Sequence, residues 1–147
     1  MAINPHFSKD ILIRWADVDA NRHVRHSAYY DYGATVRMLY FNENGLSTDQ
    51  FEALQIGPIL FREEAVFKRE ITLEDKLTVD VVITKARNDY SRWSLRHTLY
   101  KQGDLIAAII NIDGAWMDIG KRKLTVPPPV IQKMFDGFYK PPEFTFI

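Results

Sequence analysis

The spacing of apolar residues changes once, near Ser27, and this change limits the folds that the chain can adopt. From Ser27 to Gly45, apolar residues or glycine recur at the i, i+3, i+4, i+7 spacing of one helix face: Tyr29, Tyr32, Gly33, Val36, Leu39 and Tyr40. Ser27 is suited to cap the start of such a helix, and Gly45 to end it. The opposite face is also apolar, with Tyr30, Met38 and Phe41. We therefore expect a largely buried helix, in which Arg37 must find a partner or reach solvent.

The rest of the chain follows the two-residue period of strands, apart from a second short helix that Ser47 and Gln50 can cap before Gly57-Pro58. A short strand is predicted first, over Ile11 to Trp15. The longer ones follow the helices: Phe61 to Ile71, Leu77 to Thr84, Trp93 to Leu99 and Leu105 to about Asp118. Asn88-Asp89 and Gly103-Asp104 supply hairpin turns. This pattern predicts an α+β fold, in which an antiparallel sheet curls round one long central helix.

The length of 147 residues and mass of 17.1 kDa suit one domain. Proline clusters occur late, at Pro127 to Pro129 and at Pro141-Pro142. We expect the domain to occupy residues 1–126, followed by a Pro-rich tail, residues 127–147, with a short helix.

Composition narrows the chemistry. The formal net charge is +0, so no overall field attracts nucleic acid or an anionic membrane. The absence of cysteine excludes disulfides, thiolate metal sites and a cysteine nucleophile. Residues 1–7 do not resemble a signal peptide, and the apolar run from Leu105 to Ile110 is too short to span a bilayer. We expect a cytoplasmic protein.

The densest polar segment runs from Asp17 to His26, between a strand end and a helix start. The first N–H groups of a helix have no internal partner and lie at the positive end of its dipole, so they can stabilise an oxyanion. A nearby carboxylate can attack a carbonyl or activate water. A thioester suits such a site, because its thiolate leaves without strong acid help. No G-x-S-x-G motif is present, which disfavours a serine hydrolase.

The run Arg14-Trp15-Ala16-Asp17-Val18-Asp19-Ala20-Asn21-Arg22-His23-Val24, followed by Tyr29 and the long helix, resembles the signature of hotdog-fold acyl-CoA thioesterases of the hydroxybenzoyl-CoA thioesterase type. Gly57-Pro58, the series of long strands and the closing Trp116-Met117-Asp118 are also similar to that family. The resemblance covers roughly residues 8–126. It implies a hotdog fold, with a sheet of about five strands wrapped round the central helix.

The resemblance also implies roles for individual residues. Asp19 takes the place of the catalytic carboxylate, as nucleophile or general base, and the backbone N–H of His26 takes that of the oxyanion donor. His23 is a candidate for positioning Asp19 or the thioester, Asn21 for binding substrate, and Tyr29 for lining the acyl pocket. No cofactor is implied. The expected assembly is a homodimer or homotetramer, with acyl-CoA in a crevice between subunits.

The phosphates of CoA need cationic side chains. The second half of the chain offers five candidates: Lys68, Arg69, Lys85, Arg87 and Arg92. Three features depart from the family pattern. Arg22 stands where glycine is usual and would be disfavoured by about 1 kcal/mol if its φ is positive. Ala34 stands where many members have glutamate, and Arg25-His26 replace an asparagine pair.

These residues also allow other interpretations. Asp19 could cap a turn, and Asp17 is expected to be a structural hydrogen-bond acceptor. His97 alternates with apolar residues and is expected to be a hydrogen-bonded core or interface histidine. Two other functions stay open: a non-catalytic acyl-thioester-binding hotdog protein, and a metal-dependent hydrolase that uses Asp17, Asp19, His23 and His26.

Overall fold

A computed structural model describes residues 6–147. The elements follow in this order: β1 (Phe7–Ile11), the 3-10 helix η1 (Trp15–Asp17), α1 (His26–Glu43), α2 (Thr48–Leu54), β2 (Ile56–Phe67), β3 (Leu77–Ala86), β4 (Arg92–Lys101), β5 (Leu105–Asp118), β6 (Lys123–Leu124), α3 (Pro129–Asp136) and β7 (Thr145–Phe146). None of the helices within residues 6–147 is long and apolar enough to cross a bilayer.

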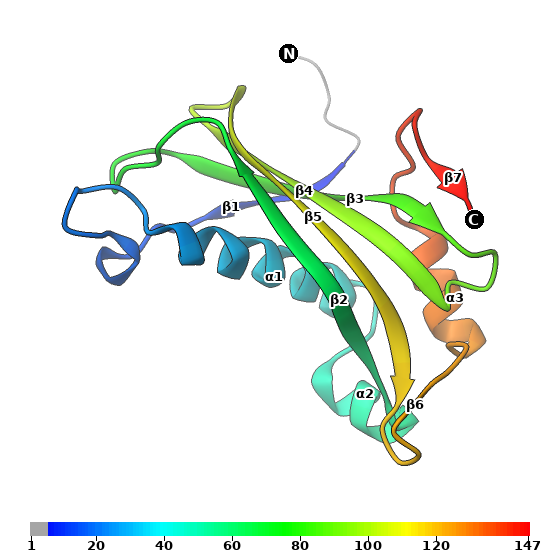
Figure 1. Cartoon of the computed structure of the whole chain (residues 1–147). Coiled ribbons are helices and arrows are strands. Elements are labelled where there is room, and N and C mark those ends of the chain that lie inside the picture. The colour runs from blue at the N-terminus through cyan, green and yellow to red at the C-terminus, as the bar shows by residue number, and fades with distance from the viewer. Residues whose placement is uncertain (1–5) are drawn as a thin grey trace.

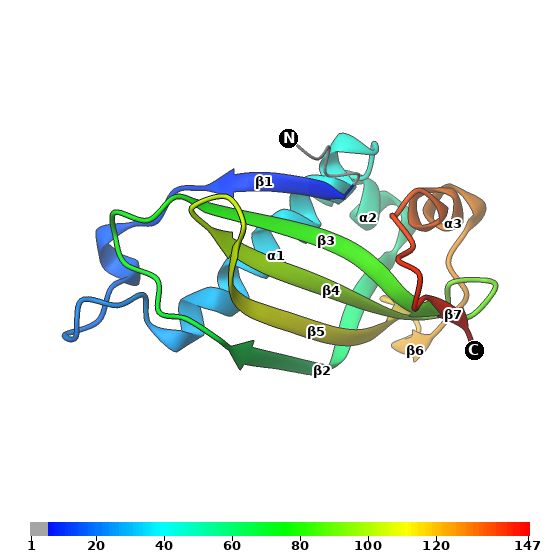
Figure 2. The ribbon, with the colours of Figure 1, turned by 90° about the horizontal axis from the view of Figure 1, so that it is seen from above.

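The main strands form one antiparallel sheet in the order β1-β3-β4-β5-β2. The short strands β6 and β7 add to β5 and β3, and β7 runs parallel to its neighbour. The sheet arches over α1, which lies against its concave side (Figures 1 and 2). The predicted α+β fold, with about five strands curled round one long helix, is confirmed.

The helix α1 is buried along most of its length, as its apolar residues predict. Gly33 lets it approach the sheet closely, because a Cβ there would lie 3.0 Å from Cδ2 of His97 on β4. Arg37 donates to Nε2 of His97 (2.9 Å), whose Nδ1 lies 2.7 Å from the carbonyl oxygen of Asp80. Burial and the charge of Arg37 lower the pKa of His97 to about 3. The ring is therefore neutral, and Nδ1–H donates to Asp80. The prediction that His97 is a hydrogen-bonded core histidine is confirmed.

The first strand differs from the prediction. It ends at Ile11, and Leu12 and Trp15 are 86% and 80% exposed. The chain leaves the sheet here because the carboxylate of Asp17 accepts from the backbone N–H and the guanidinium of Arg14, which closes a turn.

The N-cap predicted for α1 is wrong, and the N-cap predicted for α2 is confirmed. Ser27 is not the N-cap of α1: its hydroxyl accepts from the guanidinium of Arg25 (2.5 Å), and Arg25 is the N-cap. Gly45, with φ +88, follows the end of α1 as predicted. Ser47 caps α2 by accepting from the N–H of Gln50. That helix ends before Gly57-Pro58, which lie inside β2.

The C-terminal segment, residues 127–147, contains the expected short helix, α3. Ile131 and Phe135 on this helix are fully buried in the common hydrophobic core. The Phe135 ring lies 5.4 Å from the rings of both Trp93 and Trp116. The core therefore continues past residue 126: the prolines mark a change of secondary structure, and not a limit of packing.

Two glycines in the β2–β5 ladder provide a matched test of this packing. A Cβ on Gly114 would lie 2.3 Å from Cη2 of Trp93 and 2.7 Å from the carbonyl oxygen of Ile59, whereas a Cβ on Gly57 would come no closer than 3.5 Å, to Ile119. We expect Gly114→Ala to lower the free energy of unfolding by roughly 2–3 kcal/mol and Gly57→Ala to change it by less than about 0.5 kcal/mol. Urea unfolding measures both, and equal effects would contradict the packing described.

Candidate active site

The loop from Asp17 to Arg25 is held in place by the buried carboxylate of Asp17, whose side chain is only 2% exposed. This carboxylate accepts from the guanidinium of Arg14 (2.8 Å) and from the hydroxyl of Tyr32 on α1 (2.9 Å). Burial opposes ionisation, but the hydrogen bonds from Arg14 and Tyr32 outweigh it and hold the pKa of Asp17 below its ordinary value. The backbone also contributes, since the N–H of Arg25 donates to the carbonyl of Asp17 (2.7 Å). The predicted structural role of Asp17 is confirmed.

Asp19 opens a tight turn at the tip of this loop. Its N–H donates to the carbonyl of His23 (2.8 Å), and its Oδ1 accepts from the N–H groups of Asn21 (2.9 Å) and His23 (3.2 Å). Within the described residues, Oδ2 has no hydrogen-bond donor. Arg22 completes the turn with φ 67, the positive value expected for a position where glycine is usual. Asp19 thus caps the turn with one oxygen and leaves the other open to a ligand.

The first N–H groups of α1 lie at the end of the same loop. The helix begins at His26, whose N–H has no acceptor within residues 6–147, whereas Ala28 already donates to Arg25 (3.0 Å). The 18 residues of α1 add the positive end of a helix dipole at this point. A developing oxyanion would be stabilised here.

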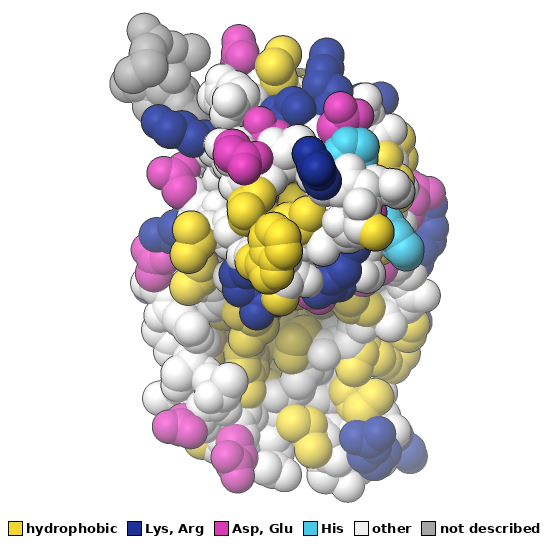
Figure 3. Space-filling view, turned by 90° about the vertical axis from the view of Figure 1, so that its left-hand side faces the viewer, with side chains coloured by type: hydrophobic (Ala, Val, Ile, Leu, Met, Phe, Trp, Pro, Cys, Tyr) yellow, Lys and Arg dark blue, Asp and Glu magenta, His cyan; other side chains and the backbone are white. Residues whose placement is uncertain are grey.

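Asp19 and His26 line one cavity of about 410 Å³. Its other walls combine the loop, the first turn of α1 and the segment after β2: His23, Val24, Tyr29, Phe67, Lys68, Arg69 and Glu70. Both views of the ribbon place the blue loop and the green connection from β2 to β3 at the same end of the molecule (Figures 1 and 2). His, Lys and Arg side chains are interspersed with Asp and Glu on this end of the molecule (Figure 3).

Two long-range contacts join the walls of this cavity. The N–H of Val24 donates to the carbonyl of Ile71 (2.7 Å), and the ring of Tyr29 packs edge-on against that of Phe67 at 4.9 Å. Burial raises the pKa of the Tyr29 hydroxyl, and the negative charges of Glu70 and Asp19 raise it further. Tyr29 is therefore a neutral, largely apolar wall of the cavity, and its role in lining an acyl pocket stays a prediction.

Of the basic residues proposed for phosphate binding, Lys68 and Arg69 border the cavity. The amides of both donate to the carbonyl of Ala107 (2.8 and 3.0 Å), which ties this segment to β5. The guanidinium of Arg69 donates to the carbonyl of Ile106 (2.6 Å). Lys68 keeps its ammonium exposed beside the cavity.

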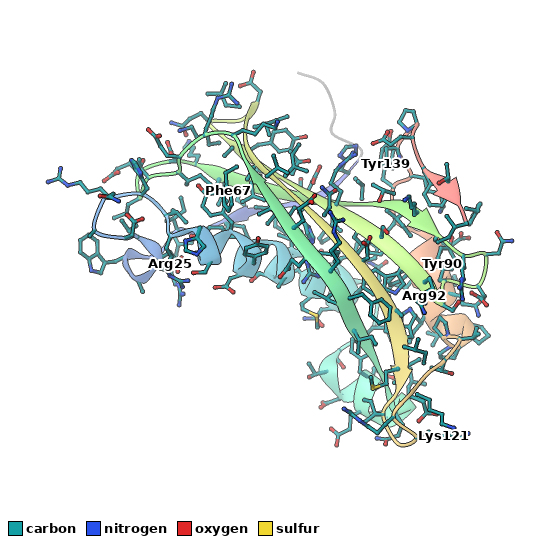
Figure 4. All side chains as sticks on the ribbon, viewed as in Figure 1. Arg25, Phe67, Tyr90, Arg92, Lys121 and Tyr139 are labelled. Atoms are coloured by element: carbon teal, nitrogen blue, oxygen red, sulfur yellow. The ribbon has the colours of Figure 1, made fainter. Side chains whose placement is uncertain are left out.

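Four other predicted binding residues do not line this cavity. Asn21 lies at the exposed tip of the turn and contributes its backbone N–H to Asp19. Arg87 and Arg92 lie at the opposite end of the sheet, where the β3–β4 turn brings their backbones together (3.0 Å), and the guanidinium of Arg92 stacks 4.7 Å from the ring of Phe61. Figure 4 shows Arg92 far from Arg25 and Phe67. Lys85 is on β3 near the same end. The alternation of polar and apolar residues along a strand does not show at which end of a curved sheet a given polar residue lies.

Sequence reasoning did not name three of the cavity residues as site residues: Val24, Phe67 and Glu70. Phe67 shares the parity of the apolar residues Phe61 and Ala65 on its strand, and it is 48% exposed on β2, at the edge of the sheet. The cluster Phe67-Lys68-Arg69-Glu70, an aromatic residue followed by charges at a strand end, was the only available signal. Within residues 6–147, no three His, Asp or Glu side chains are placed to share a metal ion.

The family to which this chain belongs follows from a match to a family model. The model of the thioesterase-like superfamily matches residues 13–135, which is most of the chain. The chain belongs to this superfamily. The expected relationship to hotdog thioesterases is confirmed, and with it the expectation of a thioester hydrolase. No curated protein matches the sequence of this superfamily member.

Solved structures share the fold at low sequence identity. The hypothetical protein SAV2348 from Staphylococcus aureus, in complex with CoA, aligns with a TM-score of 0.85 and 22% identity over 95% of this chain and 87% of its own. A 1,4-dihydroxy-2-naphthoyl-CoA thioesterase from Synechocystis gives 0.80 and 16% over 89% and 96%. A thioesterase from Thermus thermophilus complexed with coenzyme A and Zn gives 0.71 and 22% over 87% and 90%. This thioesterase-like protein therefore has a fold similar to that of these three structures.

The depressed pKa of Asp17 predicts how stability depends on pH. A carboxyl group whose pKa is lower in the folded state stabilises the fold above its unfolded pKa, about 3.9, and that contribution is lost as the pH falls through the folded value. We expect Asp17→Asn to lower the free energy of unfolding by roughly 1–3 kcal/mol at neutral pH and the difference from wild type to shrink below about pH 4. Urea unfolding at several pH values measures this. A difference that stays constant down to the acid limit would show that the charge of Asp17 does not stabilise the loop.

Proposed function

We propose that the protein hydrolyses acyl-CoA thioesters to a carboxylic acid and CoA, using the carboxylate of Asp19 and the backbone N–H of His26. One observation carries this proposal: a carboxylate with one free oxygen and the free amide of a helix N-terminus line the same cavity. Together they supply the two groups that acyl transfer to water requires.

In the proposed reaction, the thioester carbonyl carbon lies between the two groups. Oδ2 of Asp19 either takes a proton from the attacking water or attacks the carbonyl carbon itself. The carbonyl oxygen becomes an oxyanion that accepts a hydrogen bond from His26 N–H and is stabilised by the dipole of α1. The C–S bond then breaks, and CoA leaves as a thiolate. By the nucleophilic route, water afterwards hydrolyses the acyl-aspartyl anhydride and restores the carboxylate.

Because Oδ1 of Asp19 is engaged by the amides of Asn21 and His23, the turn orients the carboxylate before any substrate binds. His23 contributes through its backbone, and its ring lines the cavity beside Asp19. We propose that this ring packs against the thioester or its pantetheine arm.

Lys68 and Arg69 support CoA as the carrier, because they place positive charge at the rim of the cavity. Two structures of similar fold, from Staphylococcus aureus and Thermus thermophilus, were solved with CoA bound. We propose that the phosphates of CoA lie near Lys68 and that the acyl group enters the cavity. A role of Asn21, Arg87 and Arg92 in binding the substrate stays a prediction, as does the cytoplasmic location.

The open edge of the sheet supports assembly into a homodimer or homotetramer. In the order of strands, β2 has β5 on one side and forms the edge on the other. This strand of 12 residues leaves several hydrophobic side chains 41–52% exposed: Leu60, Phe61, Val66 and Phe67. A long hydrophobic edge invites pairing with another strand. We propose that two copies pair along β2, which would bring a second chain beside the cavity.

Asp19→Asn tests the catalytic assignment without removing the turn. The amide oxygen of asparagine can still accept from Asn21 and His23, but the side chain can neither accept the proton nor attack efficiently. We expect kcat for an acyl-CoA to fall by roughly 10²–10⁴-fold, while a non-hydrolysable acyl-CoA thioether binds within a few-fold of wild type. Release of thiol and isothermal calorimetry provide the two measurements.

Asp104→Asn is the matched control, because Asp104 is an exposed carboxylate in the β4–β5 turn at a position outside the cavity. It should leave both kcat and binding unchanged. Full turnover in the Asp19→Asn variant would refute the role of Asp19, and a parallel loss of turnover and binding would assign Asp19 to substrate binding only.

A further inference from the structure

A second cavity, of about 160 Å³, lies further along the same side of α1. Its lining is mostly apolar: Ala34, Met38 and Phe41 from α1, with Pro58 and Leu60 from β2. Ala34 has a particular effect here, since a larger side chain at this position would extend towards the cavity. The other two lining residues carry polar groups: Arg37 on α1, and Trp93 on β4, whose buried indole N–H has no hydrogen-bond partner within residues 6–147.

Arg37 is incompletely satisfied by the protein. Its side chain is 10% exposed, and Nη1 donates to the neutral ring of His97. The closest carboxylate, that of Glu63, lies 3.8 Å from Nη2, beyond hydrogen-bond distance. A guanidinium has five N–H donors, and within residues 6–147 His97 is the only hydrogen-bond acceptor of Arg37. The two atoms without a described partner, Nε and Nη2, are not among the fully buried unpaired ones, so each keeps some exposed surface.

The two cavities follow one seam between α1 and β2. Tyr29 contacts Phe67, and Arg37 approaches Glu63, four residues earlier on β2. Residue numbers therefore rise along α1 while they fall along β2, from the first cavity towards the second. Arg37 follows Tyr29 by eight positions, which corresponds to a rise of about 12 Å along the helix axis. An acyl group whose thioester lies at His26 would extend along this seam.

We propose that the second cavity receives the distal part of the acyl group and that Arg37 selects acyl groups carrying an uncharged oxygen, a hydroxyl or a carbonyl, at that end. This inference rests on the proposed function, because it places the thioester in the first cavity. Arg37 supplies free N–H donors in an otherwise apolar space, where an oxygen acceptor is stabilised and a plain hydrocarbon end leaves the donors unpaired.

The charges around Arg37 favour an uncharged oxygen over a carboxylate. Glu63 already approaches the guanidinium from β2, and its negative charge would repel a second carboxylate. His97 is neutral and cannot offset that repulsion. A hydroxyl can accept from Arg37 and donate to Glu63.

Binding to the Asp19→Asn variant tests the proposal independently of hydrolysis. Calorimetry would compare octanoyl-, decanoyl- and dodecanoyl-CoA with their ω-hydroxy and ω-carboxy counterparts, and with butanoyl-CoA, which is too short to reach Arg37. At the best-fitting length, we expect the ω-hydroxy compound to bind about tenfold or more tightly than the alkanoyl compound. Arg37→Met should remove this preference.

Since Arg37→Met can also disturb the core through His97, Ala34→Leu gives a second test. It fills the cavity from a half-buried helix position with another good helix former. It should weaken binding of the long ω-hydroxyacyl-CoA about tenfold more than that of butanoyl-CoA. Thr35→Leu introduces the same leucine side chain on the exposed side of α1 and should change neither.

Equal binding of hydroxylated and plain chains at every length would overturn the proposal, as would a preference for the ω-carboxy series. If Ala34→Leu alters the oligomeric mass but not the substrate profile, the cavity receives a second copy of the chain and the proposal is wrong. Failure of the wild-type protein to hydrolyse even butanoyl-CoA would contradict the proposed function instead, and the binding comparison would still decide the role of Arg37.

Discussion

The buried carboxylate of Asp17 is the constraint on which the candidate site depends. Asp17 connects three parts of the chain. Its carboxylate accepts hydrogen bonds from Arg14 before the loop and from Tyr32 on α1, and its backbone carbonyl accepts from the N–H of Arg25 at the start of the helix. Burial alone would favour the neutral acid, so the hydrogen bonds must keep the group charged. The position of the next acidic residue, Asp19, relative to the first turn of α1 follows from this anchor.

The site combines structural and chemical roles in the same residues. Asp19 stabilises its turn with one oxygen and leaves the other exposed, so that the orientation of the carboxylate costs no ordering when substrate arrives. Arg22 accepts a positive φ at the tip, which costs stability but keeps the turn tight. Two cavities lie between α1 and β2. The first is lined by several charged residues, and the second is mostly apolar, with Arg37 among its lining residues.

Much of the fold could be predicted from local patterns, and the site only in part. The long helix and four strands follow from the spacing of their apolar residues. The contribution of α3 to the core, the exposure of Phe67 at a sheet edge and the contact of Val24 with Ile71 depend on residues far apart in the sequence. The family motif predicted Asp19 and His26, which line one cavity, whereas Arg87 and Arg92 lie outside that cavity because a curved sheet separates the ends of its strands. The hydrogen bond of Arg37 could not be predicted either, because its acceptor, His97, lies 60 residues away in the sequence.

The amide of His26 is the proposed oxyanion donor, and NMR can follow its environment as a ligand binds. The protein would be titrated with a ketone analogue of acyl-CoA, in which a methylene separates the carbonyl from sulfur, while the amide signal of His26 is followed. If this amide stabilises the oxyanion, its proton should move downfield and exchange more slowly with solvent as the analogue binds. An unchanged shift and exchange rate at saturation would show that the His26 amide does not bind the carbonyl oxygen.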